Sequence, residues 1–224
     1  MQNKNLRELA GRPLIAWTVL QAKASALFDK IVVSSDDSAI LDAAVNAGAD
    51  EAIERPAVLA TDTAAKVPAI HHALVEAEKR FSAQFDRLID LDATAPLRLV
   101  QDIVGAVSLL EESGASSVIT GAPSHRSPYF NLVERQPDGT IRLSKPSSSA
   151  VMRRQDAPPC FDMNASIYVW RREAFVLDPR VFYPDTRLYE MPPERSHDID
   201  SELDFTIVEF LFARLRIEDA LRAS

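Results

Sequence analysis

The sequence predicts an α/β protein built on a doubly wound sheet. Three apolar runs, KIVVSS, RLIDLDA and SSVIT, are separated by segments with helical periodicity. Such runs are typical of strands buried on both faces, and strands that alternate with helices form a sheet covered by helices on both sides. Ligands of these sheets bind beyond the carboxyl ends of the strands, so the polar residues after each run are candidates for a site.

Helices are expected on either side of these strands. Pro13 stands at a helix start, and the predicted helices cover residues 14–28, 39–47, 64–80 and 99–112. Gly48 ends the second of them. A further strand at 166–170 and a helix at 202–215 complete the domain.

The pattern changes after Pro123. Residues 129–144 alternate apolar and polar side chains around a Pro-Asp-Gly turn, which predicts a β-hairpin. A two-stranded ribbon cannot bury its apolar face alone. We therefore expect residues 126–165 to form a projecting arm that contacts a second chain, inserted into a domain made of residues 1–125 and 166–224.

Composition excludes several classes of protein. The net charge of -8 and the lack of a basic run argue against a nucleic-acid partner. A lone cysteine, Cys160, excludes an internal disulfide framework, and the four histidines have no zinc-site spacing. The sequence has no apolar stretch of membrane-spanning length and no signal-peptide centre at its start. We expect a cytoplasmic protein with no membrane contact.

The segment PERSHDIDSELDF is the densest group of acids in the chain. Asp198 and Asp200 are two residues apart, so on an extended backbone both carboxylates point to one side and can bind one hard cation such as Mg²⁺. The alternative is a helix cap, formed by Asp200 or by Ser201 together with Asp204 in a capping box. The two interpretations are compatible.

Polar clusters at other strand ends and loops include several arginines, which bind carboxylates and phosphates through two parallel hydrogen bonds. For Arg55 or Arg98 taken singly, the competing interpretation is a solvated surface side chain.

The order and spacing of seven segments resemble the acylneuraminate cytidylyltransferase family, the CMP-sialic acid synthetases and their relatives. The segments are KNLRELAGRPLIAWT, VVSSDDSAI, ERPAVLATD, TAPLR, RRQDAP, MNASIYVW and ERSHDIDSELDF. The resemblance implies a Rossmann-like nucleotide-sugar transferase fold with a hairpin dimerisation arm, and therefore a homodimer. It also implies transfer of CMP from CTP to a nine-carbon 2-keto-3-deoxy sugar acid, with release of pyrophosphate and participation of Mg²⁺.

The resemblance also implies roles for individual residues. Those expected to be catalytic are Lys4, Asp198 and Asp200, of which the two aspartates bind the metal. The residues expected to bind the nucleotide are Lys4, Asn5, Arg55 and Asp92, and those expected to bind the sugar acid are Arg154, Gln155 and Asn164. The alternatives are an eight-carbon 2-keto-3-deoxy acid as substrate, or a non-catalytic binding protein with the same fold.

Three departures from the family pattern bear on these expectations. The family's first strand and its glycine-rich phosphate loop are absent, so we expect the natural chain to start further upstream and this chain to bind CTP poorly. The strands at Ile31 and Ile89 should then flank a gap or be drawn together with distortion. Asp92 replaces a glutamine of many relatives, and Ala165 replaces a glycine; both substitutions affect expected ligand contacts.

Overall fold

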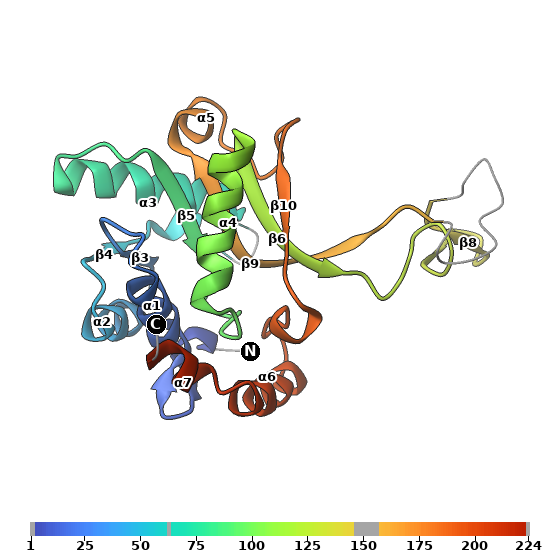
Figure 1. Ribbon diagram of the computed structural model, residues 1–224, viewed down its shortest axis with the longest axis horizontal. Coiled ribbons are helices and arrows are strands. Elements are labelled where there is room, and N and C mark those ends of the chain that lie inside the picture. Colours follow the sequence, from blue (N-terminus) through green and yellow to red (C-terminus); the bar gives the residue numbers. More distant parts are fainter. Residues whose placement is uncertain (1–2, 62–63, 146–156, 223–224) are drawn as a thin grey trace.

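A four-stranded mixed sheet forms the centre of the body (Figure 1). The computed structural model describes residues 3–61, 64–145 and 157–222. In spatial order the strands are β10 (Arg187–Glu190), β6 (Ser117–Pro123), β9 (Phe161–Arg171) and β5 (Arg87–Leu91). Strand β10 runs parallel to β6, whereas β9 is antiparallel to both β5 and β6. Strand β9 is antiparallel to β6 because the chain leaves the sheet at the carboxyl end of β6, passes through the arm and returns at the same end of the sheet.

Helices cover both faces of this sheet, as the doubly wound prediction requires. Side chains of a strand alternate between its faces, and Val118 and Val169 pack against α4 (Val100–Ser113). Their neighbours Ile119 and Trp170 pack on the other face, with α3 (Lys66–Phe81) and α5 (Arg172–Leu177). The fold class is confirmed.

The remaining helices pack beside the sheet. They are α1 (Leu14–Ser25), α2 (Ser38–Ala47), α6 (Glu202–Arg214) and α7 (Ile217–Arg222). Helix α1 is buried on most of its surface, including the polar side chains of Thr18, Gln21 and Ser25. Its Trp17 ring lies 4.8 Å from Phe212 of α6. Among the described helices, none is long and apolar enough to cross a membrane.

The amino-terminal segment is short and turns back on itself. It contains a 3-10 turn, η1 (Lys4–Leu6), followed by β1 (Glu8–Leu9) and β2 (Arg12–Pro13), which pair with each other. Pro13 immediately precedes α1, as predicted. Helix α1 ends at Ser25 and not at Phe28, because Ala26 adopts a left-handed conformation.

A gap separates the central sheet from a second, parallel pair of strands, β3 (Val32–Ser35) and β4 (Glu51–Glu54). Residues of β3 and β5 line the same cavity of about 680 Å³, together with apolar side chains of α1, α2 and α3. The prediction that the strands at Ile31 and Ile89 flank a gap is therefore confirmed. The polar backbone groups on the facing edges of β3 and β5 are not bonded to a common neighbour strand.

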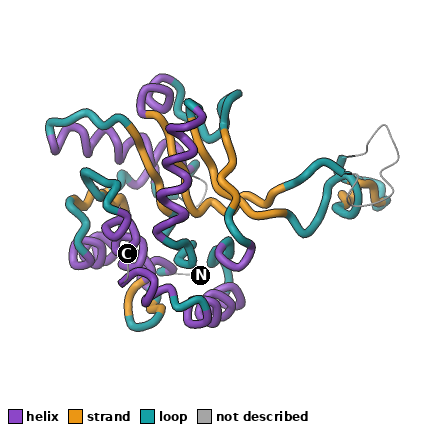
Figure 2. Tube along the Cα trace, in the orientation of Figure 1, coloured by secondary structure: helices purple, strands orange, loops and turns teal. Residues whose placement is uncertain are grey.

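The hairpin projects from the body as an arm (Figures 1 and 2). Its strands β7 (Val133–Arg135) and β8 (Ile141–Leu143) are antiparallel, and the extended ends of β6 and β9 connect it to the sheet. Strand β9 crosses the predicted domain boundary at residue 165. Ala165 there has a φ of 52°, and the β6–β9 register shifts beside it.

Candidate active site

A loop between β10 and α6 presents the two aspartates of the Asp-Ile-Asp step. Ile199 is completely buried, and its N–H donates to the carbonyl oxygen of Thr94 at 3.0 Å. Asp198 and Asp200 are both exposed on either side of it. This alternation gives the arrangement that the two-residue spacing predicts.

A buried ion pair holds the same loop against α4. Two guanidinium nitrogens of Arg195 donate to the carboxylate of Asp102, at 2.7 and 3.0 Å. Asp102 is fully buried and also accepts the backbone N–H of Leu99, at the start of α4. A two-pronged charged contact of this kind fixes orientation as well as distance.

The capping interpretation is also confirmed. Ser201 accepts a hydrogen bond from the backbone N–H of Asp204, and the Asp204 carboxylate accepts the N–H of Ser201. The hydrogen bond from the Ser201 N–H to the Asp204 carboxylate is 2.7 Å long and completes the capping box. Asp200 immediately precedes the N-cap Ser201, and its backbone N–H also donates to the Asp204 carboxylate, so the start of α6 positions this residue.

Acidic and basic groups meet at this loop. Lys4 Nζ lies 2.9 Å from Asp200 Oδ1, which joins the amino-terminal segment to the loop. Partial desolvation raises the pKa of Asp198, and the nearby charges of Asp200 and Asp92 raise it further. Among the described side chains, none forms an ion pair with Asp198. Its carboxylate is therefore placed to gain from a cation.

A second charged group lies at the carboxyl end of β5. Lys66 Nζ is 2.7 Å from Asp90 Oδ2 and 3.0 Å from Asp92 Oδ2. Burial alone would raise the pKa of Asp92, but Lys66 and two hydrogen bonds from Thr94 lower it to about 2. Burial opposes the charge of Lys66, yet the two carboxylates outweigh it and raise its pKa. Both groups stay charged at neutral pH.

Arg98 is buried and not a solvated surface residue. Its guanidinium donates to the carbonyl oxygens of Asp92 and Ser166 and to the hydroxyl of Thr18. Burial lowers its pKa to about 10, so the group remains protonated at neutral pH. Arg98 joins β5, β9 and α1 from inside the protein.

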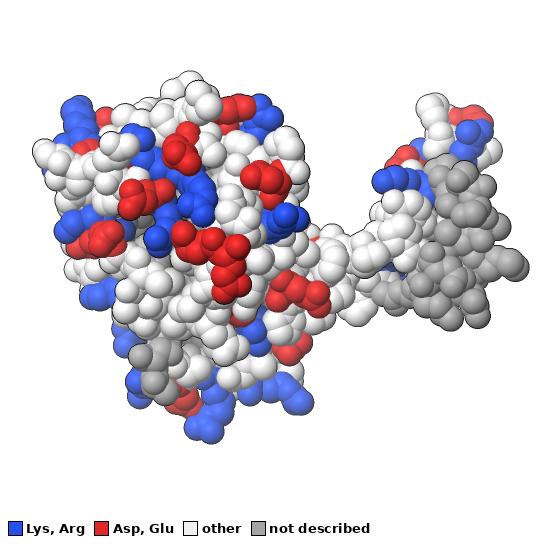
Figure 3. Space-filling view, turned by 45° about the horizontal axis from the view of Figure 1, so that its top comes forward, with Lys and Arg blue, Asp and Glu red and all other residues white. Residues whose placement is uncertain are grey.

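The cavity between β3 and β5 collects the predicted nucleotide residues. Asn5, Arg55 and Asp92 all line it, as do Ser34 and Lys66. The Arg55 guanidinium donates to the backbone carbonyl of Ser34, which holds it beside the end of β3. Figure 3 shows acidic and basic side chains interspersed on the visible face of the body.

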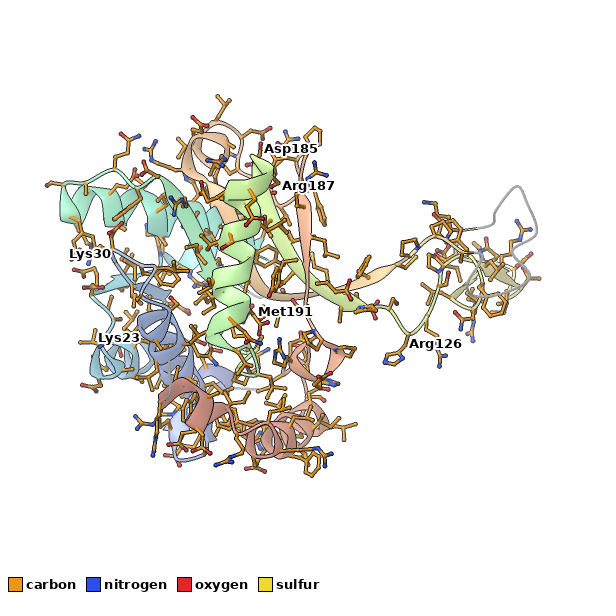
Figure 4. The ribbon with its side chains drawn as sticks, viewed as in Figure 1. Lys23, Lys30, Arg126, Asp185, Arg187 and Met191 are labelled. Carbon is orange, nitrogen blue, oxygen red and sulfur yellow. The ribbon has the colours of Figure 1, made fainter. Side chains whose placement is uncertain are left out.

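Asn164 lies apart from this cavity, and its amide is satisfied inside the protein. Its oxygen accepts from the Thr120 hydroxyl at 2.7 Å and from the N–H of Ser166. Its nitrogen donates to the Ser196 hydroxyl at 3.0 Å and to the sulfur of Met191. Met191 follows β10, at the opposite end from Arg187 (Figure 4). Asn164 thus connects β9 to the loop that carries Asp198.

The other two predicted sugar-binding residues, Arg154 and Gln155, lie outside the described residues. Of the other predicted residues, Asn5, Arg55 and Asp92 line the cavity, Lys4 does not line it but pairs with Asp200, and the charge of Asp92 acts on Asp198.

The acidic pair fits a magnesium ion that is shared with a ligand. Within residues 3–61, 64–145 and 157–222, no three histidine, cysteine, aspartate or glutamate side chains gather closely enough to enclose a metal. Mg²⁺ is commonly bound by one or two carboxylates plus substrate phosphates and water. Asp198, exposed and without an ion pair in the described chain, suits that mode.

Sequence reasoning missed Lys66 and Asp90. The signal for Asp90 was present, because RLIDLDA places it two residues before Asp92 on the same side of a strand. Lys66 carries no local signal, since its position depends on how α3 packs beside β5.

Lysine and carboxylate groups meet beyond the carboxyl ends of the strands, where ligands of α/β sheets bind. Residues 1–215 match the cytidylyltransferase family, and the chain belongs to it. It is therefore an enzyme of the nucleotidyltransferase class.

Several proteins with known names are similar to this chain. The chain is 43% identical to post-translational flagellin modification protein B of Campylobacter coli, over 97% of this chain and 92% of that protein. It is 42% identical to CMP-N,N'-diacetyllegionaminic acid synthase of Campylobacter jejuni, over 95% of this chain and 89% of that one. Among solved structures, CMP:2-keto-3-deoxy-manno-octonic acid synthetase complexed with CTP has the same fold. Its TM-score is 0.65 at 16% identity, and the match covers 96% of this chain and 93% of that chain.

Proposed function

We propose that this protein transfers CMP from CTP to a nine-carbon 2-keto-3-deoxy sugar acid of the legionaminic type, releasing pyrophosphate. The observation that carries the proposal is the 42% identity to a CMP-N,N'-diacetyllegionaminic acid synthase along almost the whole chain. The octonic acid synthetase shares the fold at only 16% identity, so it gives no support to the eight-carbon alternative.

The reaction requires the C2 hydroxyl of the sugar acid in line with the α-phosphorus of CTP, and a neutralised triphosphate. Lys4 supplies positive charge beside Asp200 and is the expected triphosphate contact. When bound, Mg²⁺ on Asp198 and Asp200 would offset phosphate charge and acidify the attacking hydroxyl. The buried Arg195–Asp102 pair and the capping box hold both aspartates in place for this role.

The predicted binding residues fall into two groups, one for each substrate. Asn5, Arg55 and Asp92, which line the cavity, are assigned to the nucleotide side. Arg154, Gln155 and Asn164 are assigned to the sugar acid, where an arginine can pair with the C1 carboxylate. Because the amide of Asn164 is already satisfied internally, its contribution to that side is to hold Ser196 and the loop that follows.

We further propose a cytoplasmic homodimer that joins through the arm. On the β7–β8 ribbon, Val133 pairs with Leu143, and Ile141 lies on the same face two residues away. All three are exposed, and together with Arg135, the cross-strand partner of Ile141, they form a mainly apolar face that gains by association with a second copy.

The proposal is tested by measuring pyrophosphate release from CTP with Mg²⁺ and one sugar acid at a time. The acids are N,N'-diacetyllegionaminic acid, N-acetylneuraminic acid and 2-keto-3-deoxy-octonic acid. We expect the highest kcat/KM with the first. A higher kcat/KM with the eight-carbon acid would contradict the assignment. If the chain and a version lengthened at its amino end bind the substrates but release no pyrophosphate, the non-catalytic alternative would be supported.

A further inference from the structure

Lys66 and Asp92 form a rigid pair of polar groups that face the cavity between β3 and β5. The ammonium is held by Asp90 and Asp92 and lies 4.8 Å from the centre of the Tyr168 ring. Contacts from three sides fix the direction of a side chain that is otherwise flexible.

Each member of the pair keeps one bonding position for a ligand. A lysine ammonium has three N–H donors; in the described chain Lys66 donates one to Asp92 Oδ2 and forms a 2.7 Å ion pair with Asp90 Oδ2. Asp92 Oδ1 accepts both the N–H and the hydroxyl of Thr94, whereas its Oδ2 has Lys66 alone as a described partner. The pair therefore offers one donor and one acceptor side by side.

The local charge determines which ligand group fits. The carboxylates of Asp90 and Asp92 are balanced by the ammonium of Lys66 and the buried guanidinium of Arg98. An ionised phosphate or carboxylate therefore gains no net attraction here, and it cannot donate a hydrogen bond to Asp92. A hydroxyl group, which both donates and accepts, matches the pair and carries no charge.

We propose that Lys66 and Asp92 together bind a hydroxyl group of a substrate, and that Lys66 is thereby a specificity residue and not a phosphate ligand. The hydroxyl belongs either to the ribose of CTP or to the sugar acid. The proposal rests on the proposed function, because that function supplies these two substrates.

The test is calorimetric binding of three probes: CTP, N,N'-diacetyllegionaminic acid and inorganic triphosphate. The variants are Lys66→Met, Asp92→Asn and a control, Lys79→Gln. Lys79 lies on the same helix, is 75% exposed and has only a 3.8 Å contact with Glu76. Thermal melting of each variant checks that it is folded.

We expect Lys66→Met to weaken either CTP or the sugar acid on the order of 10-fold, the usual effect of losing a hydrogen bond to a charged donor. The probe that weakens identifies the source of the hydroxyl. Lys66→Met also removes a positive charge, so inorganic triphosphate should bind it somewhat more weakly than the wild type, but by a smaller fold-change than the probe that carries the hydroxyl. Triphosphate should bind Asp92→Asn more tightly, because a negative charge has been removed. Lys79→Gln should change nothing.

Two results would overturn the proposal alone. One is that triphosphate weakens in Lys66→Met by as large a factor as the more affected of CTP and the sugar acid, which would make Lys66 a phosphate ligand. The other is that all three probes bind Lys66→Met as they bind the wild type. Failure to bind CTP and the sugar acid, both by the wild type and by a version lengthened at its amino end with a strand and a glycine-rich loop, would instead contradict the proposed function, and this inference with it.

Discussion

At the scale of single residues, the site depends on carboxylates whose surroundings differ sharply. Asp92 is held ionised by Lys66 and Thr94, whereas Asp198 lies in a negative field without an ion pair in the described chain. The first has its compensating charge within the protein. The second is left to be compensated by a ligand, as expected for a residue that binds a cation only when substrate is present.

Replacing Asp200 with Asn should lower turnover at least about 100-fold with little loss of stability, because the exposed carboxylate acts on the ligand and not on packing. The same holds for Asp198→Asn. The measurement is magnesium-dependent pyrophosphate release, with Glu194→Gln in the same loop as the control. Full activity of Asp200→Asn would refute the metal assignment.

The stability of the protein at acid pH should depend on Asp92. A carboxyl group whose pKa is lower in the folded than in the unfolded chain stabilises the fold above its unfolded pKa, about 3.9. That contribution is lost as the pH falls toward the folded value of about 2. Urea unfolding should therefore show a smaller loss of stability between pH 5 and pH 2 in Asp92→Asn than in the wild type. Glu209→Gln, an exposed control on α6, should lose as much stability between pH 5 and pH 2 as the wild type. If Asp92→Asn loses as much stability as this control, the prediction is contradicted.

At the scale of elements, helix α6 begins where the site ends. The capping box at Ser201 and Asp204 fixes the first turn, and Asp200 immediately precedes it. A cap lost here affects both the stability of the helix and the position of a site residue.

Ser201→Ala should lower the free energy of unfolding by about 1 kcal/mol, the usual cost of removing a cap. Ser201→Thr, which keeps the hydroxyl that accepts from the Asp204 N–H and donates to its carboxylate, should keep most of the stability. Urea denaturation of the three proteins measures both effects. If the alanine variant is as stable as the wild type, the cap contributes nothing.

At the scale of the whole molecule, two features of the fold leave surface exposed. The arm exposes an apolar face, and the sheet is divided by the gap between β3 and β5. Each is a surface on which another segment can be buried.

The double change Val133→Glu with Ile141→Glu should shift the protein from dimer to monomer, because it places two charges on the apolar face of the arm. Arg142→Glu, on the opposite face of the ribbon, is the matched control. Light scattering at micromolar concentration decides the question. A wild-type protein that is already monomeric would rule out the arm as a dimer contact.

A version lengthened at its amino end by a strand and a glycine-rich loop, on the order of 15 residues, should bind CTP more tightly. The strand would pair with the free edges of β3 and β5, and the loop would offer backbone N–H groups to the phosphates. Calorimetry reports the affinity, and amide exchange reports protection of Val32–Ser35 and Arg87–Leu91. Unchanged values in both experiments would show that the gap does not accept a strand.

The sequence by itself determined the elements with strong local signals. The helices after Pro13 and before Gly48, the strand RLIDL, the hairpin and the α6 cap all follow from periodicity and from residues with narrow conformational preferences. The Asp-Ile-Asp loop was found in the same way, because the exposure of Asp198 and Asp200 is encoded in their spacing around Ile199.

Only the tertiary structure decided which residues meet. Strands β4 and β10 are short and lack a distinctive pattern, so they were missed, and the burial of Arg98 contradicts what its charge suggests in isolation. Lys4 pairs with Asp200, which is 196 residues away in the sequence. Lys66, at the start of α3, pairs with Asp90 and Asp92 at the end of β5. These contacts depend on the packing of distant segments and on the balance of their charges, which no local run of sequence contains.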